Sequence, residues 1–122
     1  MNGVIASGTK VIFLHLPKTA GSTLRGIIER QYGSRSILPL YESNFGEELA
    51  AIPPSQMDRL CVVMGHFYFG AHASLSKPST YITVLRDPID RVISRYYFAR
   101  RSPLDPVYDA VRKISLKEYA ET

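Results

Sequence analysis

The 122-residue sequence predicts an α/β fold in which a parallel sheet is flanked by helices in three layers. Three apolar runs of strand length occur at residues 10–16, 60–64 and 80–85, and helical patterns lie between or after them. Strands that alternate with helices build parallel sheets through crossover connections. The length and a hydrophobic content of 45% are typical of one globular domain, so we expect residues 1–122 to form a single domain.

The stretch from Lys10 to Ile28 predicts a strand, a turn of small residues and the start of a helix. The apolar run at residues 10–16 ends at a proline, and a helix is expected over residues 23–32, closed by Gly33. The turn between them supplies positive charge, hydroxyl donors and a glycine for close backbone approach, which suit an anion at a helix N-terminus. These turn residues are Lys18, Thr19, Gly21, Ser22 and Thr23.

The middle of the chain has a weaker pattern. Residues 33–59 are expected to be mostly loop, with a short helix over residues 47–52. Residues 60–64 form the second apolar run, which ends before His66. Cys61 lies in this run and is the single cysteine, so we expect a buried thiol and neither a disulfide nor a cysteine-based metal cluster.

The third strand is predicted over residues 80–85, which are β-branched and aromatic. Asp87 followed by Pro88 is typical of a helix start, with the aspartate as N-cap. A weaker helix is expected over residues 106–113, and Ser115 opens a last helix with a capping-box pattern. The side chains of the Asp87 helix that we assign to the core are Ile89, Val92, Ile93, Tyr96, Tyr97 and Phe98.

Polar residues follow all three predicted strands. Lys18 follows the first strand, His66 the second and Arg86 the third. Ligands of open parallel sheets bind beyond the carboxyl ends of the strands, so this convergence predicts a ligand site. A net charge of +4 fits an anionic ligand, but it is too small to indicate nucleic acid by itself.

Arg86 and Ser94 lie on either side of the predicted helix start. Ser94 is seven residues beyond Asp87, nearly two helical turns, which returns its hydroxyl to the side of the cap. A phosphate near the helix start would then meet a guanidinium group and a hydroxyl group. The structural alternative is that Arg86 pairs with Asp87 or Asp90 and that Ser94 is an incidental surface serine.

Two motifs resemble those of sulfotransferases that use 3′-phosphoadenosine 5′-phosphosulfate (PAPS). FLHLPKTAGSTL resembles the loop that binds the 5′-phosphosulfate, and TVLRDPIDRVISRYYFAR resembles the motif that binds the 3′-phosphate. Between them, the segment from Met64 to Phe67 resembles the carbohydrate branch, whose relatives include heparan sulfate 2-O-sulfotransferase. The resemblance covers roughly residues 10–101. It implies a P-loop-like sheet and transfer of a sulfuryl group from PAPS to a hydroxyl group, on a carbohydrate, without a metal.

The resemblance also implies a role for each matching position. Lys18 would contact the sulfuryl group and the bridging oxygen, and His66 would take the proton from the acceptor hydroxyl. An imidazole suits that task because its ordinary pKa is about 6.5. The positions that would bind the nucleotide are Lys18, Thr19, Ala20, Gly21, Ser22, Thr23, Arg86 and Ser94.

The other two histidines have different expected roles. His15 lies inside an apolar strand and is expected to be a hydrogen-bonded core residue. His72 is the second candidate for the base. None of the three histidines has cysteine or acidic partners at zinc-binding spacing, so no metal site is predicted.

The sequence departs from the family pattern in two places. Ala20-Gly21 stands where the loop commonly has a pair of glycines, and we expect the turn to be kept. The sequence reaches Thr122 without the later helices and basic loop that family domains usually add, so we expect an incomplete sulfotransferase fold.

Two other functions remain open. The first is a non-catalytic module that binds PAPS or its product, adenosine 3′,5′-bisphosphate (PAP). The second is a P-loop kinase or NTPase, which the residue order disfavours because the Walker loop places its lysine after the second glycine, whereas Lys18 precedes Gly21.

The expected partners are the nucleotide co-substrate and a hydroxyl acceptor, with no nucleic acid, and the oligomeric state is left open. The first apolar run begins about ten residues from Met1, too close for a signal peptide or anchor, and no apolar run has the length of a membrane span. A cytoplasmic location is therefore expected.

Overall fold

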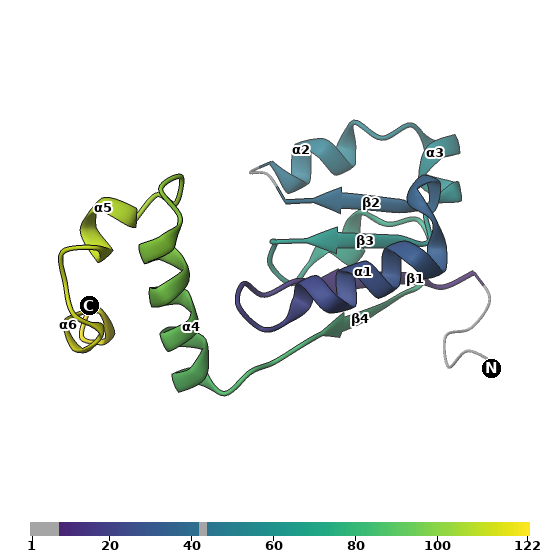
Figure 1. Cartoon of the computed structure of the whole chain (residues 1–122). Coiled ribbons are helices and arrows are strands. Elements are labelled where there is room, and N and C mark those ends of the chain that lie inside the picture. Colours follow the sequence, from purple (N-terminus) through teal and green to yellow (C-terminus); the bar gives the residue numbers. More distant parts are fainter. Residues whose placement is uncertain (1–7, 42–43) are drawn as a thin grey trace. The chain divides into compact units, whose positions relative to one another are not determined.

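The computed structural model describes residues 8–41 and 44–122 (Figure 1). These residues form two compact units. The sheet unit comprises the described residues up to Leu16 together with Ala20–Val84. The helical unit comprises Pro17–Thr19 together with Leu85–Thr122.

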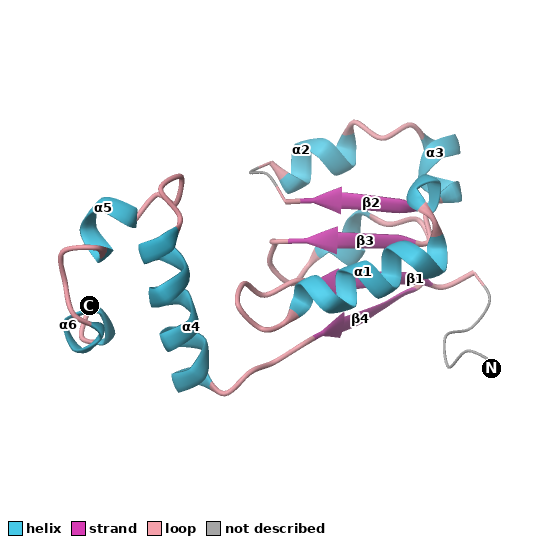
Figure 2. Cartoon of the chain, viewed as in Figure 1, coloured by secondary structure: helices cyan, strands magenta, loops and turns pink. Residues whose placement is uncertain are grey.

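The sheet unit contains four parallel strands in the order β2-β3-β1-β4, which confirms the predicted α/β fold class. The strands are β1 (Lys10–Leu14), β2 (Ile37–Leu40), β3 (Val62–Gly65) and β4 (Ser79–Thr83). The helices are α1 (Gly21–Tyr32), α2 (Phe45–Ala50) and α3 (Pro54–Arg59), with 3₁₀ turns at Ser34–Ser36 and Ala71–Ser74. Figure 2 shows the loops that leave the carboxyl ends of these strands.

Alternation along the strands gives the sheet a core on each face. One core joins Phe13, Val62 and Met64 to Ile28 of α1. The other includes Val63, which points to the opposite face, and contains side chains of α2 and α3 such as Leu49. Burial on both faces explains why these strands are continuous apolar runs rather than alternating ones.

β2 was not predicted, because Pro39 interrupts its short apolar run. Proline lacks the N–H that a ladder hydrogen bond needs, so it is tolerated in strands mainly at sheet edges. β2 is an edge strand that pairs only with β3 among the described strands, in the register Pro39↔Met64. Its pairing partner therefore decides its structure.

Lys10 is almost completely buried, with a relative exposure of 1%. Its ammonium donates hydrogen bonds of 2.6 Å to the carbonyl oxygens of Met57 and Leu60, at the end of α3. Burial, followed by repulsion from Lys77, lowers the pKa of Lys10. These contacts connect the start of β1 to the carbonyl end of a helix, where a cation is favourable.

The helical unit consists of α4 (Pro88–Arg101), α5 (Tyr108–Val111) and α6 (Leu116–Ala120). Its core joins Tyr96 and Ala99 of α4 to Val111, with Leu116 and Tyr119 packed against them. Both predicted helix starts are confirmed. Asp87 accepts hydrogen bonds from the main chain of α4, and Ser115 forms a full capping box with Glu118.

The predicted core face of α4 is wrong in part. Tyr96 is buried, but four of the assigned side chains are exposed, because α4 packs against α5 and α6 through the face that carries Tyr96 and Ala99. The exposed side chains are Ile89, Val92, Tyr97 and Phe98. The thiol of Cys61 is also exposed rather than buried, since this residue precedes the first residue of β3.

Candidate functional site

The edge of the sheet unit at which the strands end carries three polar rings. His15, Tyr41 and His66 follow β1, β2 and β3, whose last residues are in register across the sheet. His15 Nδ1 lies 2.9 Å from the Tyr41 hydroxyl oxygen. The His66 ring centre is 4.9 Å from each of the other two ring centres. We call these three residues the edge cluster.

The hydrogen bond of His66 determines which of its nitrogens is protonated. Its Nδ1 lies 2.5 Å from the main-chain oxygen of His15. A carbonyl oxygen only accepts hydrogen bonds, so Nδ1 carries the hydrogen in this pair and Nε2 keeps its lone pair. His66 is therefore held in the tautomer that can accept a proton from a substrate.

His72 is held in the opposite tautomer. The hydroxyl oxygen of Tyr81 accepts hydrogen bonds of 3.1 Å from the main-chain N–H groups of Gly70 and His72. With both acceptor positions used, the Tyr81 hydroxyl donates its own hydrogen to His72 Nδ1 at 2.8 Å. The remaining hydrogen of the neutral His72 ring is then on Nε2, which makes that nitrogen a donor.

The ring of His15 lies directly against Gly21, the first residue of α1. A Cβ atom at Gly21 would overlap the side chain of His15, so a larger residue fits there only if that ring shifts. Burial lowers the pKa of His15, and the neighbouring His66 and Arg25 lower it further. The core role expected for His15 is confirmed, and the structure adds contact with both Gly21 and His66.

The N-terminus of α1 is suited to an anion. Its N-cap, Ala20, has a left-handed backbone with φ of 63° and makes no side-chain capping bond, and the first turn contains no acidic residue. The helix also starts at Gly21, two residues earlier than predicted. No capping side chain accepts a hydrogen bond from its first N–H groups. At the start of α4, in contrast, Asp87 accepts from the N–H groups of Ile89 and Asp90.

In the helical unit, Lys18 and Arg86 are neighbours. Arg86 Nη1 lies 3.4 Å from the main-chain oxygen of Lys18, a long hydrogen bond, and Arg91 Nε lies 3.0 Å from the oxygen of Pro17. Lys18 has a left-handed φ of 64°. Its ammonium lies 4.3 Å from the ring centre of Phe98, within the range of a cation–π interaction.

The remaining predicted residues have simple surroundings. Ser94 is half-buried on α4, Thr19 is buried in the helical unit, and the side chains of Ser22 and Thr23 are exposed. Arg86 is exposed, and the expected alternative partner Asp87 is engaged as a helix cap. Each unit therefore holds part of the predicted residue set.

Sequence analysis missed two residues of these groups. Tyr41 follows the unpredicted strand β2, so no pattern assigned it to the edge. Phe98 was assigned to the core by its position in an aromatic run, but it is 42% exposed and lies under the Lys18 ammonium. The aromatic run gave no indication of that contact, because Lys18 and Phe98 are 80 positions apart in the sequence.

A sequence model of the sulfotransferase family matches residues 2–122. Searches of curated proteins and of solved structures returned no match. Across residues 8–41 and 44–122, we find no helix with both the length and the apolar character that crossing a bilayer requires.

Proposed function

The chain belongs to the sulfotransferase family, and from this premise we propose that it transfers a sulfuryl group from PAPS to a hydroxyl group of a carbohydrate. The contact between Arg86 and Lys18 supports a nucleotide with phosphates at two positions. It brings the residue proposed for the 3′-phosphate next to the residue proposed for the sulfuryl group. Two cations on adjacent segments suit a ligand with several negative charges.

The turn before α1 is proposed to bind the 5′-phosphate. The N-terminus of α1 has no side-chain cap and offers main-chain N–H groups. Lys18 and Ala20 both have a positive φ, a backbone conformation that is common in turns that bind anions. The ring of His15 occupies the space that a side chain at Gly21 would need. Thr19, Ser22 and Thr23 add hydroxyl groups.

Arg86 and Ser94 are proposed to bind the 3′-phosphate. Asp87 already accepts two main-chain N–H groups at the start of α4. A phosphate there would meet a carboxylate instead of open N–H groups, so the guanidinium of Arg86 has to supply most of the attraction. The hydroxyl of Ser94 adds a neutral donor.

Lys18 and His66 are proposed to be the catalytic residues. PAPS supplies an activated sulfuryl group, whose transfer places negative charge on the departing phosphate oxygen. The ammonium of Lys18 stabilises that charge. Nε2 of His66, which has its lone pair available, takes the proton of the acceptor hydroxyl. Phe98 holds the Lys18 ammonium in position through the cation–π contact.

Calorimetry with PAP, AMP and ATP, combined with a sulfate-transfer assay from PAPS, tests this proposal. We expect tight binding of PAP, much weaker binding of AMP, and transfer to a sugar hydroxyl. Binding of PAP without any transfer would indicate a non-catalytic nucleotide-binding module. Preference for ATP would instead support the kinase or NTPase alternative.

A further inference from the structure

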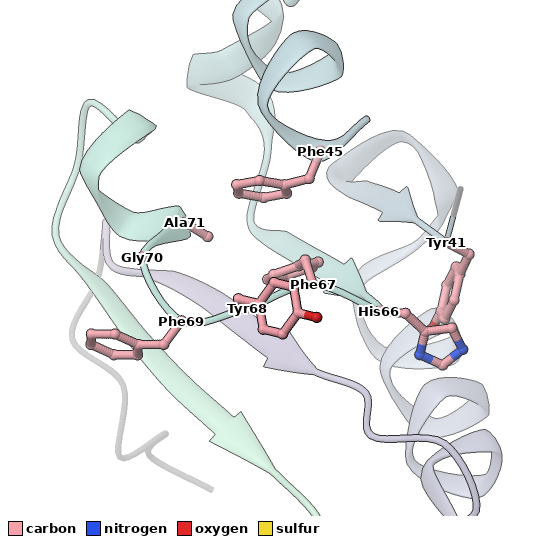
Figure 3. A pocket seen from close by; sticks show the side chains of 8 residues that line it. All are labelled: Tyr41, Phe45, His66, Phe67, Tyr68, Phe69, Gly70 and Ala71. Atoms are coloured by element: carbon pink, nitrogen blue, oxygen red, sulfur yellow. The ribbon is translucent and has the colours of Figure 1, made fainter. Parts of the chain in front are cut away.

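A cavity of about 270 Å³ lies beside His66 in the sheet unit (Figure 3). The described residues that line it include five aromatic side chains and His66 itself, namely Tyr41, Phe45, His66, Phe67, Tyr68 and Phe69. Ligand sites typically measure about 300–1,000 Å³, so the volume of this cavity is just below that range. Its volume suits one ring rather than an extended chain.

The aromatic rings have different surroundings. Phe45 and Phe67 stack on each other with ring centres 4.8 Å apart, and Phe69 contacts the rings of His72 and Tyr81. Tyr68, in contrast, is 94% exposed although it lines the cavity. Exposed aromatic surface in a concave site is typical of ligand contact.

The charge of the lining is equally informative. Among the described lining residues, none is a lysine, arginine, aspartate or glutamate. Arg25, which stacks on Tyr41, is paired with Glu29 at 2.7 Å. A carboxylate or sulfate in the cavity would lose water without gaining a cation, which is unfavourable.

We propose that this cavity is the acceptor subsite and that it takes a single uncharged pyranose ring stacked on Tyr68. The C–H groups of a pyranose face carry slight positive charge and suit the negative face of an aromatic ring. Since His66 lines the same cavity, a hydroxyl of the bound ring meets the residue proposed as the base. This inference rests on the proposed function for the fate of that hydroxyl.

Rates of sulfate transfer from PAPS to methyl β-D-glucopyranoside and to its acidic counterpart, methyl β-D-glucuronide, test the subsite. We expect the neutral glycoside to be preferred in kcat/KM. Tyr68→Ala should raise the KM for the neutral glycoside about tenfold with little change in kcat, because stacking binds ground state and transition state alike. Tyr68→Phe should behave as wild type, since it keeps the ring. Tyr97→Ala, at a half-exposed tyrosine of α4 outside the cavity lining, is the matched control and should leave KM unchanged.

Binding without nucleotide separates the two proposals. Saturation-transfer NMR with methyl β-D-glucopyranoside should show contact with the wild-type chain and loss of contact in Tyr68→Ala. One outcome is that PAP binds and sulfate is transferred, but Tyr68→Ala leaves the KM for the neutral glycoside unchanged. Another is that the glucuronide, or the non-sugar acceptor 4-nitrophenol, has a higher kcat/KM than the neutral glycoside. In either case the pyranose subsite is wrong and the proposed function stands. If PAP does not bind and no transfer occurs, the proposed function is wrong. The ring-binding site would then stand only if the NMR experiment shows contact with the glycoside that is lost in Tyr68→Ala. Absence of that contact in the wild type overturns the subsite in either case.

Discussion

His66 donates its Nδ1 hydrogen to the main-chain oxygen of His15, 2.5 Å away. The two residues directly follow β3 and β1, whose last residues Gly65 and Leu14 are paired in the sheet. Strand register therefore sets the tautomer of His66. Because the acceptor belongs to the main chain, replacing the side chain of His15 leaves it in place.

His66→Ala is expected to abolish most sulfate transfer. A positioned general base contributes a factor of about 10²–10⁴ in rate, so kcat should fall by that order while the Kd for PAP stays near the wild-type value. Stopped assays of transfer and calorimetry of PAP binding measure the two effects. His72→Ala is the matched variant and should retain most activity, since His72 Nε2 is a donor. If His72→Ala is inactive and His66→Ala is active, the general base is His72 and not His66.

Lys18→Ala should lower kcat far more than it weakens PAP binding, because its charge acts on the departing oxygen. Phe98→Leu should lower kcat by about two- to fivefold, the equivalent of the 0.5–1 kcal/mol of an exposed cation–π contact. Phe98→Tyr should retain the wild-type rate. Equal losses of kcat and nucleotide affinity in Lys18→Ala would show that the lysine only binds.

Arg86→Ala and Ser94→Ala should weaken binding of nucleotides that carry a 3′-phosphate. A hydrogen bond to a charged group contributes about 1.5–3 kcal/mol, so Arg86→Ala should have the larger effect. Calorimetry with PAP and with adenosine 5′-phosphosulfate, which lacks the 3′-phosphate, measures the selectivity. The assignment is wrong if both ligands lose the same affinity.

Gly21→Ala should destabilise the sheet unit, because the new methyl group overlaps the ring of His15. Overpacking of this kind costs about 1–3 kcal/mol in the free energy of unfolding. Gly26→Ala in the same helix meets no atom within 4 Å, so it should stabilise by about 0.5–1 kcal/mol. Urea denaturation of both variants gives the comparison, and equal stabilities would contradict the contact.

The free energy of unfolding should decrease as the pH falls below 6.5. Burial, His66 and Arg25 lower the pKa of His15 in the folded chain. Between the folded and unfolded pKa values only the unfolded state binds the proton, so acid favours unfolding. Urea denaturation at a series of pH values should show a smaller slope for His15→Gln than for the wild type. If the slope for His15→Gln equals that of the wild type, His15 does not contribute to the pH dependence of the free energy of unfolding.

Several elements were predicted correctly because their signals are local. The apolar runs of β1, β3 and β4, the Asp87 cap of α4 and the capping box at Ser115 each depend on residues close together in the chain. The small-residue turn before α1 was recognisable for the same reason.

The errors concern residues whose surroundings come from distant segments. β2 forms through pairing with β3, and the buried face of α4 is the one that packs against α5 and α6. The contact of Phe98 with Lys18 joins segments far apart in the sequence. Hydrophobic periodicity predicts that a face is buried, but it does not identify the partner or the degree of burial.

The sequence by itself determined the strands β1, β3 and β4, the capped starts of α4 and α6, and the placement of Lys18, His66 and Arg86 after the strands, since propensity, caps and turn chemistry act over a few residues. Only the tertiary structure decided which nitrogen of His66 and of His72 is protonated, that the ring of His15 packs against Gly21, and that Tyr68 is exposed beside a cavity. These properties depend on strand register and on contacts between segments, and no local pattern encodes them.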